Sequence, residues 1–277
     1  MAALARDADL SVDWRRCLPG WQPGAPLLAC RELGSGSGGD AWRVSTPAGR
    51  FVLKQRRHLD SVVDLQRMRA LQNLAADHGC APRMLALDLT AQVELSEWLP
   101  GTTPAADELS RPEFLQRVAR SLGRLHRIAL PRAWQAQTTW HFNIQDQLHD
   151  RWTRLRERGD FADRDTIASR IAQIPAWLAI LQNGQRPPAL LHLDVHAGNL
   201  LVADDLWLLD WEYAHLGDPL WDLASLAAPL QWPVPEDEAL GLALLQAAGR
   251  LADISWEQLR AARELCRLLH ELWRLEQ

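Results

Sequence analysis

The sequence predicts an α+β fold of two unequal lobes, a small antiparallel β-sheet lobe followed by a larger, mainly helical lobe. Three observations support this prediction. Short apolar runs with β-type alternation fill the first hundred residues, helical spacing dominates after residue 110, and Pro100-Gly101 interrupts the chain between them. We therefore expect an N-terminal lobe over residues 1–98 and a C-terminal lobe over residues 99–277.

The first lobe reads as a small sheet with one helix. Strands are expected around residue 30, over residues 41–55 with a turn at residues 47–49, and over residues 92–99. A helix is expected over residues 61–79, because Val63, Leu71 and Leu74 share an apolar side and Gly79 is a good helix terminator.

The second lobe begins with a clear helix over residues 112–128, where Leu115, Val118, Leu122 and Leu125 recur at three and four residues. Its most informative stretch is "LLHLDVHAGNLLVADDLWLLDWEYA", residues 190–214, in which polar side chains follow apolar runs that read as buried strands. Burying a carboxylate without partners is costly. These groups therefore either satisfy one another or bind a charged ligand.

Composition excludes several classes of function. The net charge is −5 and the arginines are scattered among acids, so we expect no nucleic-acid partner. No apolar stretch reaches membrane-spanning length and no signal peptide is recognisable, so we expect no membrane partner and a cytoplasmic location. Cys17, Cys30, Cys80 and Cys266 are far apart, which indicates reduced thiols. The oligomeric state is not predictable from these residues.

A glycine-rich turn, "GSGSGGD" at residues 34–40, lies between two predicted strands. Glycines let backbone N–H groups approach a phosphate closely, and the residues concerned are Ser35, Gly36, Ser37, Gly38 and Gly39. The alternative is a flexible hairpin without a ligand. Lys54 follows on the next strand, among Phe51, Val52 and Leu53. An isolated ammonium group is costly to bury among apolar residues, and a bound phosphate would explain its presence. The other interpretation is an edge-strand lysine whose long side chain reaches water.

Residues 190–214 supply a second set of groups for phosphoryl transfer. Asp194 and Asn199 have the D-x-x-x-x-N spacing in which the Asp positions an attacking hydroxyl and the Asn coordinates Mg²⁺. Asp210 follows a short apolar strand and offers a second oxygen ligand. A glycine-rich turn, a strand lysine, a hinge, this loop and a strand aspartate occur in the order of a protein-kinase-like fold.

Two other functions are compatible with some of these residues. His192, Asp194 and His196 alternate, so on an extended segment they could bind Zn²⁺ or Mn²⁺ in a metal-dependent hydrolase. That hypothesis leaves Lys54 and Asn199 without roles. A nucleotide-binding module without catalysis would have lost the base or a metal ligand, and none is lost. We expect His192 to brace the loop and His196 to contact the γ-phosphate.

The segments "HLDVHAGNLLV", "LLDWEYA" and "GDPLWDLA" resemble the aminoglycoside phosphotransferase and choline kinase superfamily. Together with the "SGG" turn, "FVLKQ" and "EWLPG", they are most similar to the bacterial thiamine kinases. The resemblance implies a two-lobed kinase fold and Mg²⁺-dependent transfer of the ATP γ-phosphate to a small-molecule hydroxyl. Thiamine is the first candidate acceptor, with choline, ethanolamine or an aminoglycoside as alternatives, and most of these are cations.

Carried onto this sequence, the resemblance makes Asp194 the group that orients the hydroxyl, with Asn199 and Asp210 as Mg²⁺ ligands. Lys54 would bind the α and β phosphates, and backbone groups of Glu97, Trp98 and Leu99 would meet the adenine.

The sequence departs from the kinase pattern at the acid that usually pairs with the strand lysine, and it leaves the roles of four later residues open. The helix after the Lys54 strand offers Asp64 where kinases carry a Glu, so the partner of Lys54 stays open. Trp211 and Glu212 are candidates for the acceptor site; a core Trp beside a salt-bridged Glu is the alternative. Asp218 and Asp222 either contact substrate, cap the next helix or brace the loop.

Overall fold

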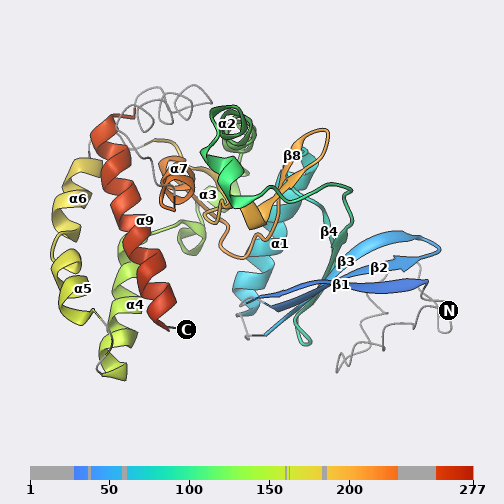
Figure 1. Cartoon of the computed structure of the whole chain (residues 1–277), viewed down its shortest axis with the longest axis horizontal. Helices are drawn as coiled ribbons and strands as arrows, with labels where there is room; N and C mark the ends of the chain where they lie inside the picture. Colours follow the sequence, from blue (N-terminus) through green and yellow to red (C-terminus); the bar gives the residue numbers. More distant parts are fainter. Residues whose placement is uncertain are drawn as a thin grey trace. The chain divides into compact units, whose positions relative to one another are not determined.

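The computed structural model describes residues 28–36, 39–57, 61–159, 161, 163–182, 186–229 and 254–276 (Figure 1). The chain divides into two compact units, Met1–Thr102 and Thr103–Gln277. The division lies next to the Pro100-Gly101 interruption in the sequence. Each unit is described by itself below.

The first unit is built on a five-stranded antiparallel sheet with the strand order β1-β2-β3-β5-β4. The strands are β1 (Ala29–Gly36), β2 (Gly39–Thr46), β3 (Gly49–Arg56), β4 (Met84–Asp88) and β5 (Val93–Glu97). Sequence patterning did not predict β4. This five-residue strand ends in a turn in which the Asp88 carboxylate accepts the N–H groups of Thr90 and Ala91, both at 2.9 Å.

The two faces of this sheet have different partners. One face carries a cluster of buried apolar side chains, namely Val44, Phe51, Leu53, Val93 and Leu95. The other face contacts helix α1 (Val62–Asp77), since Arg56 reaches the sulfur of Met68 at 3.7 Å and Gln72 donates to Ser96 at 3.5 Å. Side chains alternate along a strand, so Lys54 lies on the same face as Arg56, toward α1.

Helix α1 forms where the sequence predicts it. The Ser61 hydroxyl accepts the N–H of Asp64 at 3.1 Å and caps the first turn, and Gly79 follows the last turn with φ of 68°. Leu71 is fully buried and Leu74 is half-buried. The side chain of Val63 is outside the described part of the structure.

The second unit is mainly helical. Among the described residues its α-helices are α2 (Pro112–His126), α3 (Arg132–Gln135), α4 (Ile144–Arg158), α5 (Arg164–Ile171), α6 (Ile174–Leu181), α7 (Leu220–Ala227) and α9 (Trp256–Glu276). Two small antiparallel ladders join β6 (Ala189–Leu191) to β9 (His215–Gly217) and β7 (Leu200–Val202) to β8 (Leu206–Leu208). In α2, the four apolar residues predicted to share a face are all buried.

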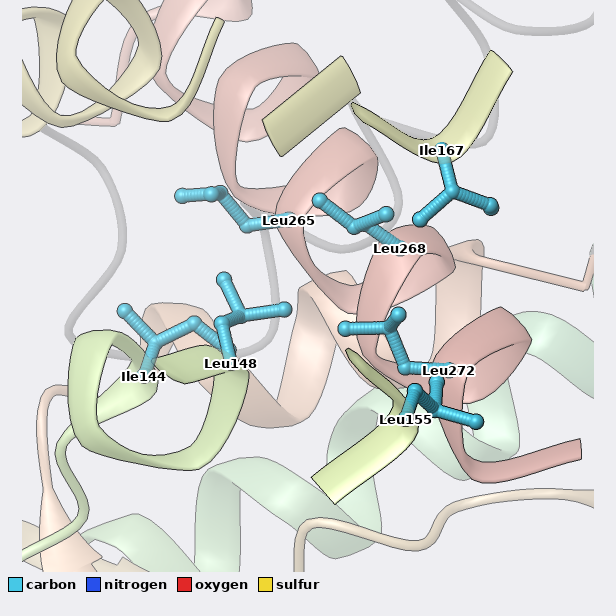
Figure 2. Packing of buried hydrophobic residues seen from close by; sticks show 7 residues of the cluster. All are labelled: Ile144, Leu148, Leu155, Ile167, Leu265, Leu268 and Leu272. Carbon is cyan, nitrogen blue, oxygen red and sulfur yellow. The ribbon is translucent and has the colours of Figure 1, made fainter. Parts of the chain in front are cut away.

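Helix α9 runs beside α4, α5 and α6 (Figure 1). Figure 2 shows the apolar side chains that hold them together, which are Ile144, Leu148, Leu155, Ile167, Leu265, Leu268 and Leu272. Arg151 and Arg154 of α4 both pair with Glu276 at the end of α9. The C-terminal helix is therefore fixed against α4 along its length.

Three of the four cysteines lie in the described part of the chain. Within the described residues, Cys30, Cys80 and Cys266 form no disulfide bond with one another, and Cys17 lies outside those residues. Of the helices that the structure describes, none has the length and apolar character needed to span a bilayer.

Candidate functional site

The glycine-rich segment forms the end of the β1–β2 hairpin. Gly36 pairs with Gly39 and Ser35 with Asp40, while Ser37 and Gly38 lie outside the described residues. Gly39 has φ of 146°, and a Cβ at this position would overlap the backbone carbonyl oxygen of Gln55. Only glycine therefore allows β2 to approach β3 this closely.

Lys54 sits in the middle of the sheet, on β3. It is half-buried, and its register partners are Ala41 on β2 and Glu94 on β5. Directly opposed residues of antiparallel strands have adjacent side chains on the same face. The structure thus places an acid beside Lys54 on the neighbouring strand, at Glu94, which also lies 3.8 Å from Arg56.

Asp64, the acid of α1 that the sequence offered as a partner for Lys54, has other partners. Its carboxylate accepts the Ser61 hydroxyl at 2.6 Å and pairs with Arg67 at 2.7 Å. Asp64 therefore stabilises the start of the helix. This difference from the kinase pattern follows from its position in the first turn, where a carboxylate favours the helix dipole.

The hinge residues are tied to the first unit through their backbones. The Glu97 N–H donates to the carbonyl of Arg83 at 2.9 Å, and the Trp98 N–H donates to that of Arg50 at 3.4 Å. The Arg43 guanidinium lies 5.2 Å from the centre of the Trp98 ring. Adenine recognition by residues 97–99, Leu99 included, stays a prediction.

In the second unit, the loop after β6 is held by a buried carboxylate from α7. Asp222 is completely buried and accepts the N–H groups of His192 at 3.0 and 3.2 Å and of Leu193 at 2.7 Å. The Nε2 atom of the buried His126, on α2, lies 2.7 Å from the same carboxylate. Asp222 therefore braces the loop, which was one of the roles expected from its sequence position.

His192 connects this loop to the segment that ends in Asp210. The ring is fully buried; its Nε2 donates to the carbonyl of Leu209 at 2.7 Å and its Nδ1 accepts the Asp194 N–H at 3.3 Å. The bracing role predicted for His192 is confirmed by these contacts. Because both ring nitrogens are used, His192 is not available to a metal, which argues against the hydrolase hypothesis. Within the described ranges, no three or more His, Cys, Asp or Glu side chains gather as a metal site.

Asp194 is partly exposed and is oriented by two neighbours. Asn199 Nδ2 donates to its carboxylate at 2.6 Å and to its backbone carbonyl at 3.0 Å. His196 Nε2 lies 3.4 Å from the same carboxylate oxygen, while His196 Nδ1 accepts the Gly198 N–H at 3.1 Å. The Gly198 amide thus selects the tautomer in which Nε2 carries the proton and donates to Asp194.

The electrostatics favour the ionised form of Asp194. Burial acts to raise the pKa of Asp194, but the hydrogen bond from His196 and the other nearby histidines outweigh it and lower that pKa below its ordinary value. The same hydrogen bond raises the pKa of His196. Asp194 is therefore a carboxylate that can accept a hydrogen bond from a hydroxyl group.

Asn199 and Asp210 are brought together by the β7–β8 hairpin. Leu200 pairs with Leu208, and the Leu209 N–H donates to the carbonyl of Asn199 at 2.8 Å. Asn199 directly precedes β7 and Asp210 follows β8 by two residues, so both lie at the same end of the hairpin. Because the Asn199 amide nitrogen faces Asp194, its Oδ1 atom is the one left for a cation. An amide and a carboxylate oxygen are donors that suit Mg²⁺.

The three residues after Asp210 become more exposed along the chain. Trp211 is only 1% exposed, its indole N–H donates to the carbonyl of Leu208 at 2.9 Å, and its ring lies 4.9 Å from that of His192. Trp211 is thus a core residue in this structure, as the alternative interpretation stated. Glu212 is half-buried, and Tyr213 is 36% exposed.

Two side chains near Asp194 were missed by sequence reasoning. Burial raises the pKa of Tyr213, and the carboxylates of Glu212, Asp194 and Asp210 raise it further. His270 of α9 has its pKa lowered by burial, although the nearby Asp194 opposes this. The surroundings of Asp194 therefore combine carboxylates with a phenol and a histidine from the C-terminal helix.

Two bracing residues were also missed. His126 carried a weak signal, because it occupies the buried face of an amphipathic helix. Ser225, which donates to the carbonyl of Leu193 at 2.9 Å, carried none. Asp218 was expected to contact substrate, cap the following helix or brace the loop. It accepts the N–H of Leu220 at 2.9 Å, at the start of that helix, and pairs with Arg186 at 3.0 Å.

Similar proteins are found both by sequence and by structure. The thiamine kinase of Shigella boydii serotype 4 (strain Sb227) is 29% identical over 206 residues, which cover 69% of this chain and 63% of that protein. The match thus spans less than two thirds of that relative's length.

Solved structures match a larger part of the chain. A choline/ethanolamine kinase family protein from Mesorhizobium loti has a TM-score of 0.71 at 20% identity, covering 97% of this chain and 86% of that one. The choline kinase LicA from Streptococcus pneumoniae has a TM-score of 0.70 at 19% identity, with 90% and 85% covered, and LicA in complex with AMP has one of 0.71. The predicted kinase-like α+β fold is confirmed by these likenesses.

The sequence of this chain also matches a protein family described as "Phosphotransferase enzyme family". The match covers residues 29–264, which is most of the chain. The matched range includes Lys54, Asp194, Asn199 and Asp210. This chain therefore belongs to the phosphotransferase enzyme family.

Proposed function

We propose that this protein is a small-molecule kinase that transfers the γ-phosphate of ATP to a hydroxyl group of its substrate. The observation that carries the proposal is the geometry around Asp194. Asn199 orients the Asp194 carboxylate at 2.6 Å, and the β7–β8 hairpin brings Asp210 to the same end as Asn199. A hydroxyl-orienting carboxylate and two Mg²⁺ ligands are the protein groups that phosphoryl transfer requires.

Each group has a defined role in this proposal. Asp194 accepts or orients the proton of the attacking hydroxyl, and Asn199 and Asp210 hold Mg²⁺, which neutralises charge on the phosphates when bound. In the first unit, Lys54 would bind the α and β phosphates, and the backbone amides of residues 35–39 would cover them. Such groups act by positioning and charge neutralisation, so we expect direct transfer without a phosphorylated enzyme.

His196 is given a different role from the one first expected. In the described structure its Nε2 atom faces Asp194, at 3.4 Å. A contact between His196 and the γ-phosphate would require the ring to leave that carboxylate. We therefore propose that His196 orients Asp194 before the nucleotide is bound, and that its contact with the phosphate depends on a movement of the ring.

Thiamine is the acceptor that we propose first. A named thiamine kinase is similar in sequence, and the groups near Asp194 suit a cation, since Tyr213 lies close enough to Glu212, Asp194 and Asp210 for their charges to raise its pKa. An aromatic ring among carboxylates favours a positively charged ligand such as a thiazolium. Choline or ethanolamine is the second candidate, because the similar solved structures include kinases of that type.

In this proposal the two lobes have different roles. Residues 1–98 would bind the nucleotide, with the backbone of Glu97, Trp98 and Leu99 at the adenine. Residues 99–277 would supply the catalytic loop and the acceptor site, with Glu212 and Tyr213 near the acceptor and Trp211 supporting them from the core.

The experiment that tests the proposal is ADP release from Mg-ATP with thiamine, choline, ethanolamine and kanamycin as separate acceptors. The Asp194→Ala variant serves as the blank. A thiamine-dependent signal that is lost in this variant supports the full proposal. Turnover on choline alone keeps the kinase and replaces the acceptor, and the absence of turnover on every acceptor contradicts the proposed activity for this panel.

A second variant separates the kinase from a metal-dependent hydrolase. Lys54→Ala should weaken ATP use by at least about tenfold in kcat/KM, since a half-buried cation that binds phosphates contributes one to two charge-assisted hydrogen bonds. Arg50→Ala, which removes an exposed cation from the same strand, is the control. A hydrolase that uses Asp194 and His196 would not respond to either change.

A further inference from the structure

The residue before Asp194 has an unusual backbone conformation. Leu193 has φ of 66°, in the left-handed region that residues with a bulky side chain rarely adopt. Such a conformation is strained and persists only where surrounding contacts impose it. The direction in which the Asp194 side chain leaves the loop depends on this backbone turn.

The contacts that impose it come from one face of α7. Asp222 and Ser225 are three residues apart on this helix and therefore project from the same side. Asp222 accepts the Leu193 N–H at 2.7 Å, and the Ser225 hydroxyl donates to the Leu193 carbonyl at 2.9 Å. The backbone of Leu193 is thus held on both sides of its Cα atom.

The two contacts act on different peptide groups. Asp222 holds the peptide between His192 and Leu193, whereas Ser225 holds the peptide between Leu193 and Asp194. The N–H of that second peptide has only a long contact, at 3.3 Å, to the ring of His192. Ser225 therefore makes the shorter of these two contacts to the peptide that directly precedes the Asp194 Cα atom.

We propose that Ser225 is a positioning residue for Asp194. Its hydroxyl fixes the plane of the Leu193–Asp194 peptide and so aims the Asp194 carboxylate at the acceptor hydroxyl. The inference rests on the proposed kinase function for its effect on catalysis, while the effect on the loop backbone is independent of that function. Ser225 itself is 4% exposed and contacts no reacting atom in this assignment.

The chain offers a matched control for this proposal. Ser121 of α2 is 2% exposed, and its hydroxyl donates to the carbonyl of Leu206 at 3.0 Å. Ser121 and Ser225 are both buried helix serines of the second unit that bind a backbone carbonyl. Ser121, however, binds the start of β8, away from the Leu193–Asp194 peptide. Removing either hydroxyl leaves a buried carbonyl acceptor without that partner and should lower stability similarly.

The test compares Ser225→Ala, Ser121→Ala and Ser225→Thr in steady-state kinetics and thermal unfolding. We expect Ser225→Ala to lower kcat by about 10- to 100-fold with the KM for ATP within twofold, because a small misplacement of a reacting group has effects of this size. Ser225→Thr keeps a hydroxyl and should recover most of the activity. Ser121→Ala should lower the Tm by a similar amount and leave kcat within twofold. An equal fall in kcat for the two alanine variants, or no fall for Ser225→Ala, would overturn the proposal.

Hydrogen exchange provides a readout that does not need turnover. The peptide covering residues 190–196 should exchange at least about tenfold faster in Ser225→Ala than in Ser121→Ala, at matched stability. Unchanged exchange would overturn the positioning role of Ser225 even if the protein is an active kinase. Faster exchange in a protein that phosphorylates no acceptor in the panel would instead support the contact of Ser225 with the loop backbone and contradict the proposed function.

Discussion

The two parts of the candidate site are positioned in different ways. In the first unit, the glycine hairpin and Lys54 are placed by strand register, with Gly36 opposite Gly39 and Lys54 opposite Ala41 and Glu94. In the second unit, the loop from His192 to Asn199 is placed by side chains from other elements. His126 of α2 and Asp222 and Ser225 of α7 all contribute.

The difference has a simple physical origin. A strand satisfies its backbone groups through its neighbours in the sheet, so its side chains are positioned without additional partners. A buried loop leaves backbone N–H and C=O groups that side chains or water must satisfy. The loop that carries Asp194 therefore depends on residues 30 and 32 positions away in sequence, and on His126, which is 96 positions from the Asp222 that it supports. Substitutions at distant sequence positions should consequently disturb the position of Asp194 more than they disturb the position of Lys54.

The largest effect is expected for Asp194→Ala. Loss of the group that orients the hydroxyl should lower kcat by about 10²- to 10⁴-fold while ATP still binds. Asp204→Ala, which removes an exposed carboxylate from the β7–β8 turn, should leave kcat unchanged. ADP release and ATP titration together measure both quantities, and a loss of ATP binding in Asp194→Ala would show that this residue does not act as assigned.

The next largest effect is expected for Asp222→Ala. The change leaves the buried His126 and the N–H groups of His192 and Leu193 without their partner, which should lower the free energy of unfolding by about 3 kcal/mol. Asp218→Ala is the matched control, because Asp218 is half-exposed and holds the Leu220 N–H and Arg186 at the start of the same helix; losing these two contacts should cost about 1 to 2 kcal/mol. Urea unfolding of both variants makes the comparison, and equal losses would contradict the special role of Asp222.

A smaller effect is expected in the first unit. Gly39→Ala places a methyl group against the backbone of Gln55 and should destabilise the protein by about 2 kcal/mol and weaken ATP binding. Gly34→Ala meets nothing within 4 Å, so its cost should be below about 1 kcal/mol. Thermal unfolding with and without ATP tests both, and the comparison of the two units fails if Gly34→Ala is as damaging as Gly39→Ala.

The smallest effect concerns thiol reactivity. Burial raises the pKa of Cys266 to about 12, and the neighbouring Asp222 contributes to this rise. The thiol should therefore stay protonated and resist iodoacetamide at pH 8, whereas the half-buried Cys30 should react first. Peptide mass spectrometry after a timed exposure gives the order. Rapid labelling of Cys266 in the folded protein would mean that the packing of α9 on α7 is looser than the structure indicates.

Local patterns in the sequence predicted the elements that depend on near neighbours. The helix of residues 62–77, the amphipathic α2 and the β2–β3 hairpin form as expected, because caps, glycine turns and apolar spacing act over a few residues. The spacing of Asp194, Asn199 and Asp210 likewise suggested that they lie together, and the β7–β8 hairpin provides the reason. The short strand β4 was missed because its five residues leave little room for a periodic pattern.

Contacts between distant segments could not be predicted in this way. The sequence left open whether Trp211 is a core residue or an acceptor contact, and its burial beside His192 depends on how β8 packs against the loop. It offered Asp64 for Lys54, whereas the structure engages Asp64 with Ser61 and Arg67 and places Glu94 opposite Lys54.

The sequence by itself determined the two-lobed α+β class, helices α1 and α2, the β2–β3 hairpin, and the residues proposed to bear the chemistry of the reaction. Local propensity and side-chain chemistry are properties of single residues and short segments, so they can be read directly. The tertiary structure decided how Asp194 is held: by a buried Asp222 that needs His126, and by Ser225 at the strained Leu193. These contacts exist only once α2, α7 and the loop pack together, because hydrogen bonds form between atoms about 3 Å apart whatever their separation in sequence.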